Sequence, residues 1–330
     1  MRGRREQTFF KIARQMARSC VDVTGPTCMK DESCNIVVED TVVKEVWRRH
    51  MERLMNFENI WDGNVKCEVE EGLRCLLSPN EFEEALKQCS QGKAAGPSGV
   101  VVELMATSGR LGMEWMTVLG NSILDEDRIP SDWSLSALVP LFKGKRDPLV
   151  CGSYRAIKLL EHAVKVYERV LEKRLRQQVV IGSMQFGFML GKGTTDTIFT
   201  VRQLQEKHLS KRKELYFGFV NLEKAFNQVP REVVRWALRK AGVEEWLVPA
   251  VMALFVDARW FVQTALDDSE SFKVKVGLHQ GSVLSLLLFI IVMDVLSREA
   301  REGLPWEVLS TDDLALMAES EQGLMVKLRA

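Results

Sequence analysis

The strongest local signal in the sequence is STDDLALMAE, residues 310–319. It places two adjacent carboxylates, Asp312 and Asp313, between the short apolar segments 306–310 and 314–317, which predicts a β-hairpin with the acidic pair at its turn. Neighbouring carboxylates resist joint ionisation unless a positive charge lies beside them. The pair is therefore either a polar turn or part of a site for divalent cations, which phosphoryl-transfer enzymes hold in pairs about 4 Å apart.

A second acidic pair shows that two adjacent aspartates can also be a simple hairpin turn. Asp267 and Asp268, followed by Ser269, separate the predicted strands 260–266 and 272–276, and we interpret them only as the turn of a hairpin. The rest of the chain must therefore decide between a turn and a cation site at Asp312 and Asp313.

Amphipathic helices and short strands make up the remainder of the chain. Apolar residues at helical spacing predict helices at 39–57, 78–89, 101–105, 112–123, 159–180, 194–209 and 231–241. Segments 136–142 and 215–222 are predicted strands, and the glycine-rich segment 92–99 is a predicted loop. Helices and strands do not alternate regularly, so the sequence predicts an α+β fold rather than a doubly wound one.

The composition is that of an ordinary globular protein and argues against a strongly basic nucleic-acid binder. Hydrophobic residues make up 46% of the 330 residues and charged residues 27%, with 45 basic side chains against 45 acidic ones. Contacts with nucleic acid would need a local basic patch, and the alternative for each candidate is a solvated helix face or loop. The candidates, which include three residues predicted to face outward from helix 159–180, are Lys143, Lys145, Arg146, Lys173, Arg174, Arg176, Lys192, Lys211, Arg212 and Lys213.

No segment has the pattern of a secretory signal or a membrane span. The basic residues 1–6 are not followed by an apolar run of signal-peptide length, and the longest apolar run, 283–295, is interrupted by Ser285 and Asp294 and is too short to cross a bilayer. Six of the seven cysteines lie before residue 90, without a Cys-x-x-Cys pair or a histidine at metal-ligand spacing. We expect a soluble intracellular protein with reduced thiols.

Two more stretches join 310–319 in a set that resembles a known family. Segments 217–230 (FGFVNLEKAFNQVP) and 277–298 (GLHQGSVLSLLLFIIVMDVLSR), together with 310–319, occur in the order and spacing of the three palm motifs of non-LTR retrotransposon (LINE-type) reverse transcriptases. Four upstream segments resemble the fingers motifs of that family: 92–100, 138–147, 151–175 and 185–199.

The resemblance implies an RNA-directed DNA polymerase with a right-hand fold. Fingers would occupy about 91–210 and a partial palm about 211–330 of one reverse transcriptase domain, 91–330. Residues 1–90 form a predicted helical region, which resembles more weakly the connector between an endonuclease and the polymerase in such elements. The implied partners are an RNA template, a DNA primer and deoxynucleoside triphosphates.

The resemblance also assigns residues to the chemistry. Asp312 and Asp313 align with the paired palm carboxylates, which bind Mg²⁺ in the family and catalyse nucleotide transfer. At Asn221 the family has the aspartate that completes this set and binds both ions. An amide is neutral and cannot bridge two cations as a carboxylate does, so we expect activity to be lower by orders of magnitude.

The nucleotide side of the site is implied in the same way. Phe226 aligns with an aromatic residue that excludes the 2′-hydroxyl of the nucleotide, and its alternative role is to pack in the core. Gln280 and Gly281 match the turn beside the incoming nucleotide. Lys143 and Arg155 align with cations that hold the triphosphate, and the alternative for both is a solvated charge.

Further departures from the family pattern point to a degenerate copy. The family usually has other residues at Asn227, Leu286, Ser310 and Thr311. The chain ends at Ala330, just beyond the predicted hairpin, so we expect the thumb to be absent and the copy to be truncated. Two alternatives to an impaired reverse transcriptase stay open: a residual nucleic-acid-binding protein, and a relic of a mobile element without function. Residence in the nucleus or cytoplasm follows only from the resemblance.

Overall fold

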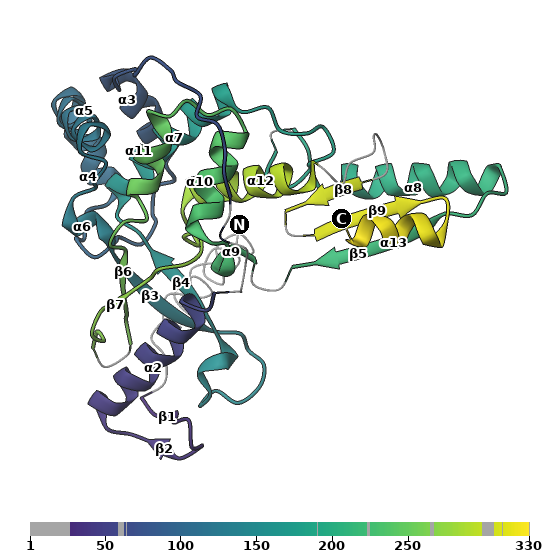
Figure 1. Ribbon diagram of the computed structural model, residues 1–330. Coiled ribbons are helices and arrows are strands. Elements are labelled where there is room, and N and C mark those ends of the chain that lie inside the picture. Colours follow the sequence, from purple (N-terminus) through teal and green to yellow (C-terminus); the bar gives the residue numbers. More distant parts are fainter. Residues whose placement is uncertain are drawn as a thin grey trace, which may run out of the picture.

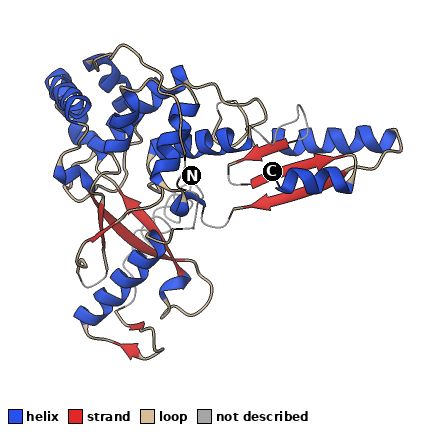
Figure 2. Cartoon of the chain, viewed as in Figure 1, coloured by secondary structure: helices blue, strands red, loops and turns tan. Residues whose placement is uncertain are grey.

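A four-stranded and a three-stranded β-sheet, called below the larger and the smaller sheet, flank a body of helices, and a further sheet has two strands (Figures 1 and 2). The structure is a computed structural model that describes residues 27–58, 63, 65–189, 191–222, 225–264, 267–298, 307–311 and 313–329. Its helices are α2 (Asp40–Met55), α3 (Pro79–Lys87), α4 (Val102–Thr107), α5 (Gly109–Glu126), α6 (Ser131–Ser134), η1 (Cys151–Ser153), α7 (His162–Gln178), α8 (Thr194–Ser210), α9 (Ala225–Gln228), α10 (Arg231–Lys240), α11 (Leu247–Ala253), α12 (Val283–Ser297) and α13 (Glu321–Arg329). Its strands are β1 (Met29–Lys30), β2 (Ile36–Val37), β3 (Leu135–Phe142), β4 (Tyr154–Leu159), β5 (Tyr216–Asn221), β6 (Arg259–Val262), β7 (Phe272–Lys273), β8 (Glu307–Ser310) and β9 (Asp313–Ala318). The predicted α+β class is confirmed.

The larger sheet has the strand order β4-β3-β6-β7. Strand β3 runs antiparallel to β4 and parallel to β6, and β6 runs antiparallel to β7. The predicted strand 136–142 and the predicted hairpin of 260–266 and 272–276 are confirmed, with shorter strands in the hairpin. Strand β4 is not evident from sequence periodicity. Its last residue, Leu159, falls in the predicted helix 159–180, which therefore starts too early.

Helix α2 covers this four-stranded sheet. Its buried residues Val43, Trp47, Met51 and Met55 follow one another at intervals of four, which places them on one stripe of the helix. Trp47 meets Tyr154 of β4 edge to face, with the ring centroids 5.0 Å apart. The predicted helix 39–57 is confirmed, and its apolar stripe is a packing face.

The helical body packs around α12, which is buried on nearly every side between α7 and α10. Only an apolar sequence can occupy such a position, and the one charged residue within it, Asp294, is held by a hydrogen bond from the Gly182 amide at 2.9 Å and by Arg298 at 3.1 Å. None of the helices in the described part of the chain combines the length and apolar composition that a membrane crossing requires.

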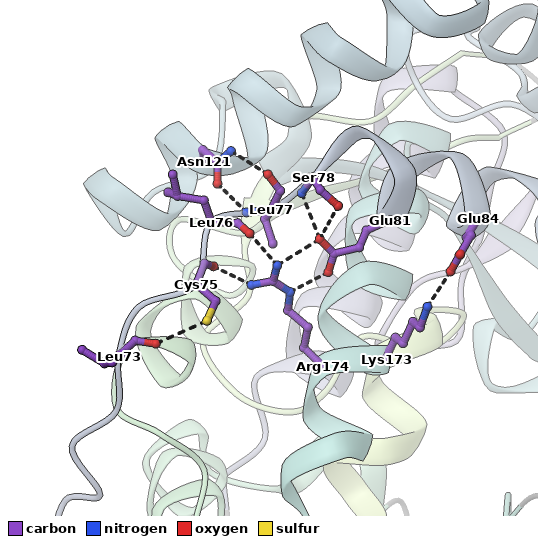
Figure 3. Close-up of polar contacts among 10 residues, drawn as sticks. All are labelled: Leu73, Cys75, Leu76, Leu77, Ser78, Glu81, Glu84, Asn121, Lys173 and Arg174. Carbon is purple, nitrogen blue, oxygen red and sulfur yellow. Dashed lines mark hydrogen bonds and ion pairs between the residues drawn. The ribbon is translucent and has the colours of Figure 1, made fainter.

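Arg174 of α7 does not face outward as predicted. Its guanidinium is clamped between the Glu81 carboxylate and the backbone carbonyls of Cys75 and Leu76, as Figure 3 shows, and its side chain is only 11% exposed. The neighbouring Lys173 pairs with Glu84 of α3 at 2.5 Å. The sequence does not reveal these partners because α3 and α7 are about ninety positions apart in the chain. Arg174 thus links two elements and is not part of a free basic surface.

The smaller sheet has the strand order β5-β9-β8, with every pair antiparallel. It confirms the predicted strand 215–222 and the predicted hairpin of 306–310 and 314–317. Apolar side chains of α8 pack on one face and those of α13 on the other, because successive strand residues point to opposite faces. Figure 1 shows this sheet extending from the body between the two helices.

Candidate nucleotide and metal site

Asn221 and Asp313 meet where β5 ends and β9 begins. The strand register pairs the two residues directly, and Ser310 of β8 lies opposite Asp313 on the other side. The side-chain amide Nδ2 of Asn221 donates a hydrogen bond to Oδ1 of Asp313 at 2.5 Å, and both residues are exposed. Asp312, the other predicted metal ligand, lies outside the described residues.

The described donors at this position do not fit a pair of divalent cations. Only the NH₂ end of an amide can contact a carboxylate, so Asn221 presents hydrogen-bond donors to the space where a cation would need oxygens. Asp313 is then the one carboxylate of the contact. Across the described ranges, no cluster of three or more His, Cys, Asp or Glu side chains could hold a metal ion.

A groove with a volume of about 850 Å³ runs beside this pair. It lies between α8 and the small sheet, with Ile198 and Leu209 on the helix side and Phe219 on the sheet side. These three side chains are largely exposed, so the groove walls are mainly apolar. Asn221 and Asp313 form part of its lining.

Phe226 of α9 packs against the core helix α12. Its ring stacks on Phe289 with the centroids 4.2 Å apart and the planes 20° from parallel. The residue is half-buried, and its carbonyl accepts a hydrogen bond from the Leu278 amide at 2.8 Å. Phe226 therefore joins the core to the segment that carries Gln280 and Gly281.

The turn at 277–281 depends on glycine at two positions. Gly277 has φ +79°, and a Cβ there would lie 2.5 Å from the carbonyl oxygen of Asn227. Gly281 has φ +86°, and its Cβ would lie 3.3 Å from the carbonyl oxygen of Lys158. Both conformations favour glycine, and the close approaches place the turn between α9 and β4. Gln280 is exposed at the surface of the turn.

Lys143 and Arg155 lie at the same end of the β3–β4 hairpin. Arg155 is opposite Leu141 in the register, and the Lys143 amide donates to the Ser153 carbonyl at 3.0 Å. Both side chains are exposed, and Lys143 Nζ donates to the Gly152 carbonyl at 3.1 Å. The hairpin thus carries one cation just beyond β3 and one on β4, and the other end of β4 lies against Gly281.

The predicted site residues fall into two groups. Contacts connect Phe226 through Leu278 to the turn at Gly281, and the turn to β4, which carries Arg155. Asn221 and Asp313 form a pair of their own at the end of the small sheet. Sequence reasoning did not identify a third group of residues, the buried Lys158, Glu168 and His279 beneath the turn. Its only signal is the presence of ionisable residues among apolar ones.

Comparison with known proteins gives a family-level match. The profile of the family described as "Reverse transcriptase (RNA-dependent DNA polymerase)" matches residues 143–330. This range contains β4, the 277–281 turn and the whole small sheet. It thus includes both groups of predicted site residues.

Individual relatives come from insect retrotransposons. The chain is 24% identical over 262 residues to a Retrovirus-related Pol polyprotein from type-1 retrotransposable element R2 of Nasonia vitripennis, covering 76% of this chain and 25% of that protein. It is 31% identical over 176 residues to the corresponding polyprotein from element R1 of Bradysia coprophila, covering 49% and 17%. An RNA-directed DNA polymerase from mobile element jockey of Drosophila funebris is 28% identical over 219 residues, covering 62% and 23%. The chain spans a quarter or less of the length of these relatives.

Proposed function

Because the chain belongs to the reverse transcriptase family, and its relatives are non-LTR retrotransposon polymerases, we propose that it is a polymerase domain in which RNA-directed DNA synthesis is impaired. The observation that carries this proposal is the hydrogen bond from the Asn221 amide to Asp313. An amide at this position removes one negative charge and directs a donor at the neighbouring carboxylate. A cation at Oδ1 of Asp313 would compete with that donor.

The loss of one carboxylate has a large expected effect on rate. Electrostatic stabilisation of the transition state is commonly the largest contribution to catalysis, and a deficit of about 4 kcal/mol corresponds to roughly a thousandfold slower reaction. Asp312 and Asp313 remain the proposed ligands for Mg²⁺. The described donors by themselves do not fit a pair of divalent cations.

The second part of the proposal concerns nucleotide binding by Phe226, Gln280, Gly281, Lys143 and Arg155, here called the nucleotide group. Lys143 and Arg155 would contact the triphosphate, because exposed cations at one end of a hairpin suit concentrated negative charge. The turn at Gln280 and Gly281 would lie beside the nucleotide, and Phe226 would limit space near the sugar. We propose residues 91–330 as the polymerase domain and 1–90 as the connector region.

Primer extension on an RNA template tests the proposal, with Mg²⁺ and Mn²⁺ supplied separately. We expect no extension by the natural sequence. Robust extension that disappears in Asp313→Ala would contradict impairment at Asn221.

Metal binding provides a readout that does not require activity. Electron paramagnetic resonance of Mn²⁺ should show that Asn221→Asp binds the ion at least about tenfold more tightly than the natural sequence, which corresponds to about 1.4 kcal/mol. Asn227→Asp is the matched control because it adds the same charge on α9, which is not part of the contact between β5 and β9. Equal gains in both variants would show that only net charge matters.

The exposed cations favour a second candidate function, binding of nucleic acid without synthesis. Lys145 and Arg146 are exposed beside Lys143 and Arg155, whereas Lys173 is engaged by Glu84. Affinity for an RNA–DNA duplex should fall steeply with salt if phosphate contacts dominate. Replacing Lys143, Lys145 and Arg146 by alanine should flatten that dependence, and Lys173→Ala should not. A flat response in the natural sequence excludes this function.

A further inference from the structure

Three buried ionisable side chains lie beneath the turn at 277–281. Lys158 comes from β4, Glu168 from α7 and His279 from the turn itself, with exposures of 6%, 1% and 5%. Burial of a charge is unfavourable unless partners compensate it, so such a group is retained only where its contacts are well defined. None of the three has a place in the proposed contacts with nucleotide.

Glu168 holds the start of α12. Its Oε2 accepts a hydrogen bond from the Val283 amide at 3.1 Å, and interaction with the Ser282 side chain lowers the pKa of this carboxyl. The Ser282 oxygen in turn accepts from the Ser285 amide at 3.1 Å. The first amides of a helix have no partner within it and carry partial positive charge, so a carboxylate from α7 satisfies them well. Glu168 therefore ties the residues that follow Gly281 to α7.

Lys158 and His279 surround Trp260 on the other side of the turn. The ammonium of Lys158 lies 4.3 Å from the centroid of the Trp260 ring. The His279 ring lies 4.7 Å from that of Phe255 and 5.7 Å from that of Trp260, and its Nε2 has no hydrogen-bond partner among the described residues. The backbone of Lys158 also lies against Gly281. The turn is thus in contact with β4 and Trp260 at Gly281 and His279, and Glu168 of α7 holds the residues that follow it.

Burial opposes the charged form of each member. It raises the pKa of Glu168, although Ser282, Lys158, the Val283 amide and Lys165 act in the opposite direction. It lowers the pKa of Lys158 well below 10.5, against the attraction of Glu168 and together with the repulsion of Arg231. It lowers the pKa of His279 well below 6.5, and the nearby cations Lys158 and Arg231 add to this. The charge state of each member therefore depends on burial and on its charged neighbours.

We propose that Lys158, Glu168 and His279 are positioning residues that fix the Gln280–Gly281 turn against β4 and so set its place relative to Arg155. Arg155 stands three residues before Lys158 on the same strand. Only the consequence for nucleotide binding rests on the proposed function. The fixing of the turn stands on the contacts alone.

Amide hydrogen exchange tests the fixing of the turn. In Glu168→Leu the amides of 279–285 should exchange at least about tenfold faster than in the natural sequence, because local opening becomes easier. Glu168→Gln should remain close to the natural sequence, since an amide oxygen still accepts from Val283. Lys158→Met, which keeps the length of the side chain, provides a second variant should Glu168→Leu fail to fold.

The matched control is Glu307→Leu, which removes an equally buried carboxylate from β8, where Glu307 pairs with Lys327 at 2.6 Å. It reproduces general destabilisation without touching the turn. If exchange at 279–285 accelerates no more in Glu168→Leu and Lys158→Met than in Glu307→Leu, the proposal is overturned.

Binding of a fluorescent deoxynucleoside triphosphate with Mn²⁺ tests the consequence. Affinity should fall about tenfold in Glu168→Leu and recover in Glu168→Gln, while affinity for an RNA–DNA duplex stays unchanged. Faster exchange with unchanged nucleotide affinity overturns the positioning role. If the natural sequence binds no nucleotide but the exchange result holds, the proposed function fails and the fixing of the turn survives.

Discussion

Arg174 and Asn221 form the same kind of contact, a nitrogen donor on a carboxylate, in two regions with different demands. In the helical body, Arg174 is 11% exposed and bonds to Glu81 and two backbone carbonyls (Figure 3). At the end of the small sheet, exposed Asn221 makes one contact, with exposed Asp313. The contact of Arg174 holds elements of the body together, whereas the contact of Asn221 at the sheet end is accessible to a ligand. Substitutions should therefore act on stability in the first region and on ligand binding in the second.

The largest effect is expected where α2 covers the four-stranded sheet. Trp47→Ala should lower the free energy of unfolding by about 4 kcal/mol, because it removes a fully buried aromatic side chain and leaves a cavity. Chemical denaturation measures this. Trp115→Ala, at a tryptophan that is 73% exposed, should change stability by less than about 0.5 kcal/mol. A similarly small loss in both variants would show that the packing of α2 on the four-stranded sheet contributes little to stability.

The next effect separates two neighbours on α7. Arg174→Ala should cost about 3 kcal/mol of unfolding free energy, because it leaves the largely covered Glu81 carboxylate and two carbonyls without their partner. Lys173→Ala removes an ion pair whose side chains are about half exposed and should cost less than about 1 kcal/mol. Equal losses of unfolding free energy in Arg174→Ala and Lys173→Ala would show that burial does not make the Arg174 contacts stronger than the Lys173 ion pair.

A pH dependence follows from Glu81. Burial alone would raise the pKa of its carboxyl, but the hydrogen bonds from Arg174 and Ser78 outweigh burial and lower the pKa from 4.5. This contribution to stability is present above the unfolded pKa and is lost as pH falls through the lower folded pKa. The unfolding free energy of Glu81→Gln should therefore decline less below about pH 4.5 than that of the natural sequence.

A double-mutant cycle identifies the partner responsible for this pH dependence. In an Arg174→Ala background, Glu81→Gln should have a much smaller effect on the slope of stability against pH, because the main opposing interaction is already gone. An undiminished effect would assign the dependence to another group.

The smallest effect on stability is expected at the sheet end. Asn221→Ala should change the free energy of unfolding by less than about 1 kcal/mol, because it removes a single exposed hydrogen bond. Thermal or chemical unfolding without added metal measures it. A loss above about 2 kcal/mol would place Asn221 among the structural contacts of the body and would remove the contrast between the two regions.

Much of the architecture could be predicted from the sequence. Helix α2, the hairpin of β8 and β9, and strand β5 follow from local periodicity, because burial on one side imposes a regular spacing on apolar residues. The family resemblance implied that Asn221 lies near Asp312 and Asp313, and the strand register places it opposite Asp313. Their roles in metal binding, and those of the nucleotide group, remain predictions.

The sequence by itself determined the family, through motifs whose order and spacing are properties of the chain, and it identified Asn221 as the departure on which the proposed loss of activity depends. The fold was needed to show which of the described charged residues are buried in structural contacts. Arg174 looks like any outward residue of an amphipathic helix, and Lys158, Glu168 and His279 look like scattered ionisable residues. Their burial depends on partners that are distant in sequence, and local periodicity carries no information about such partners.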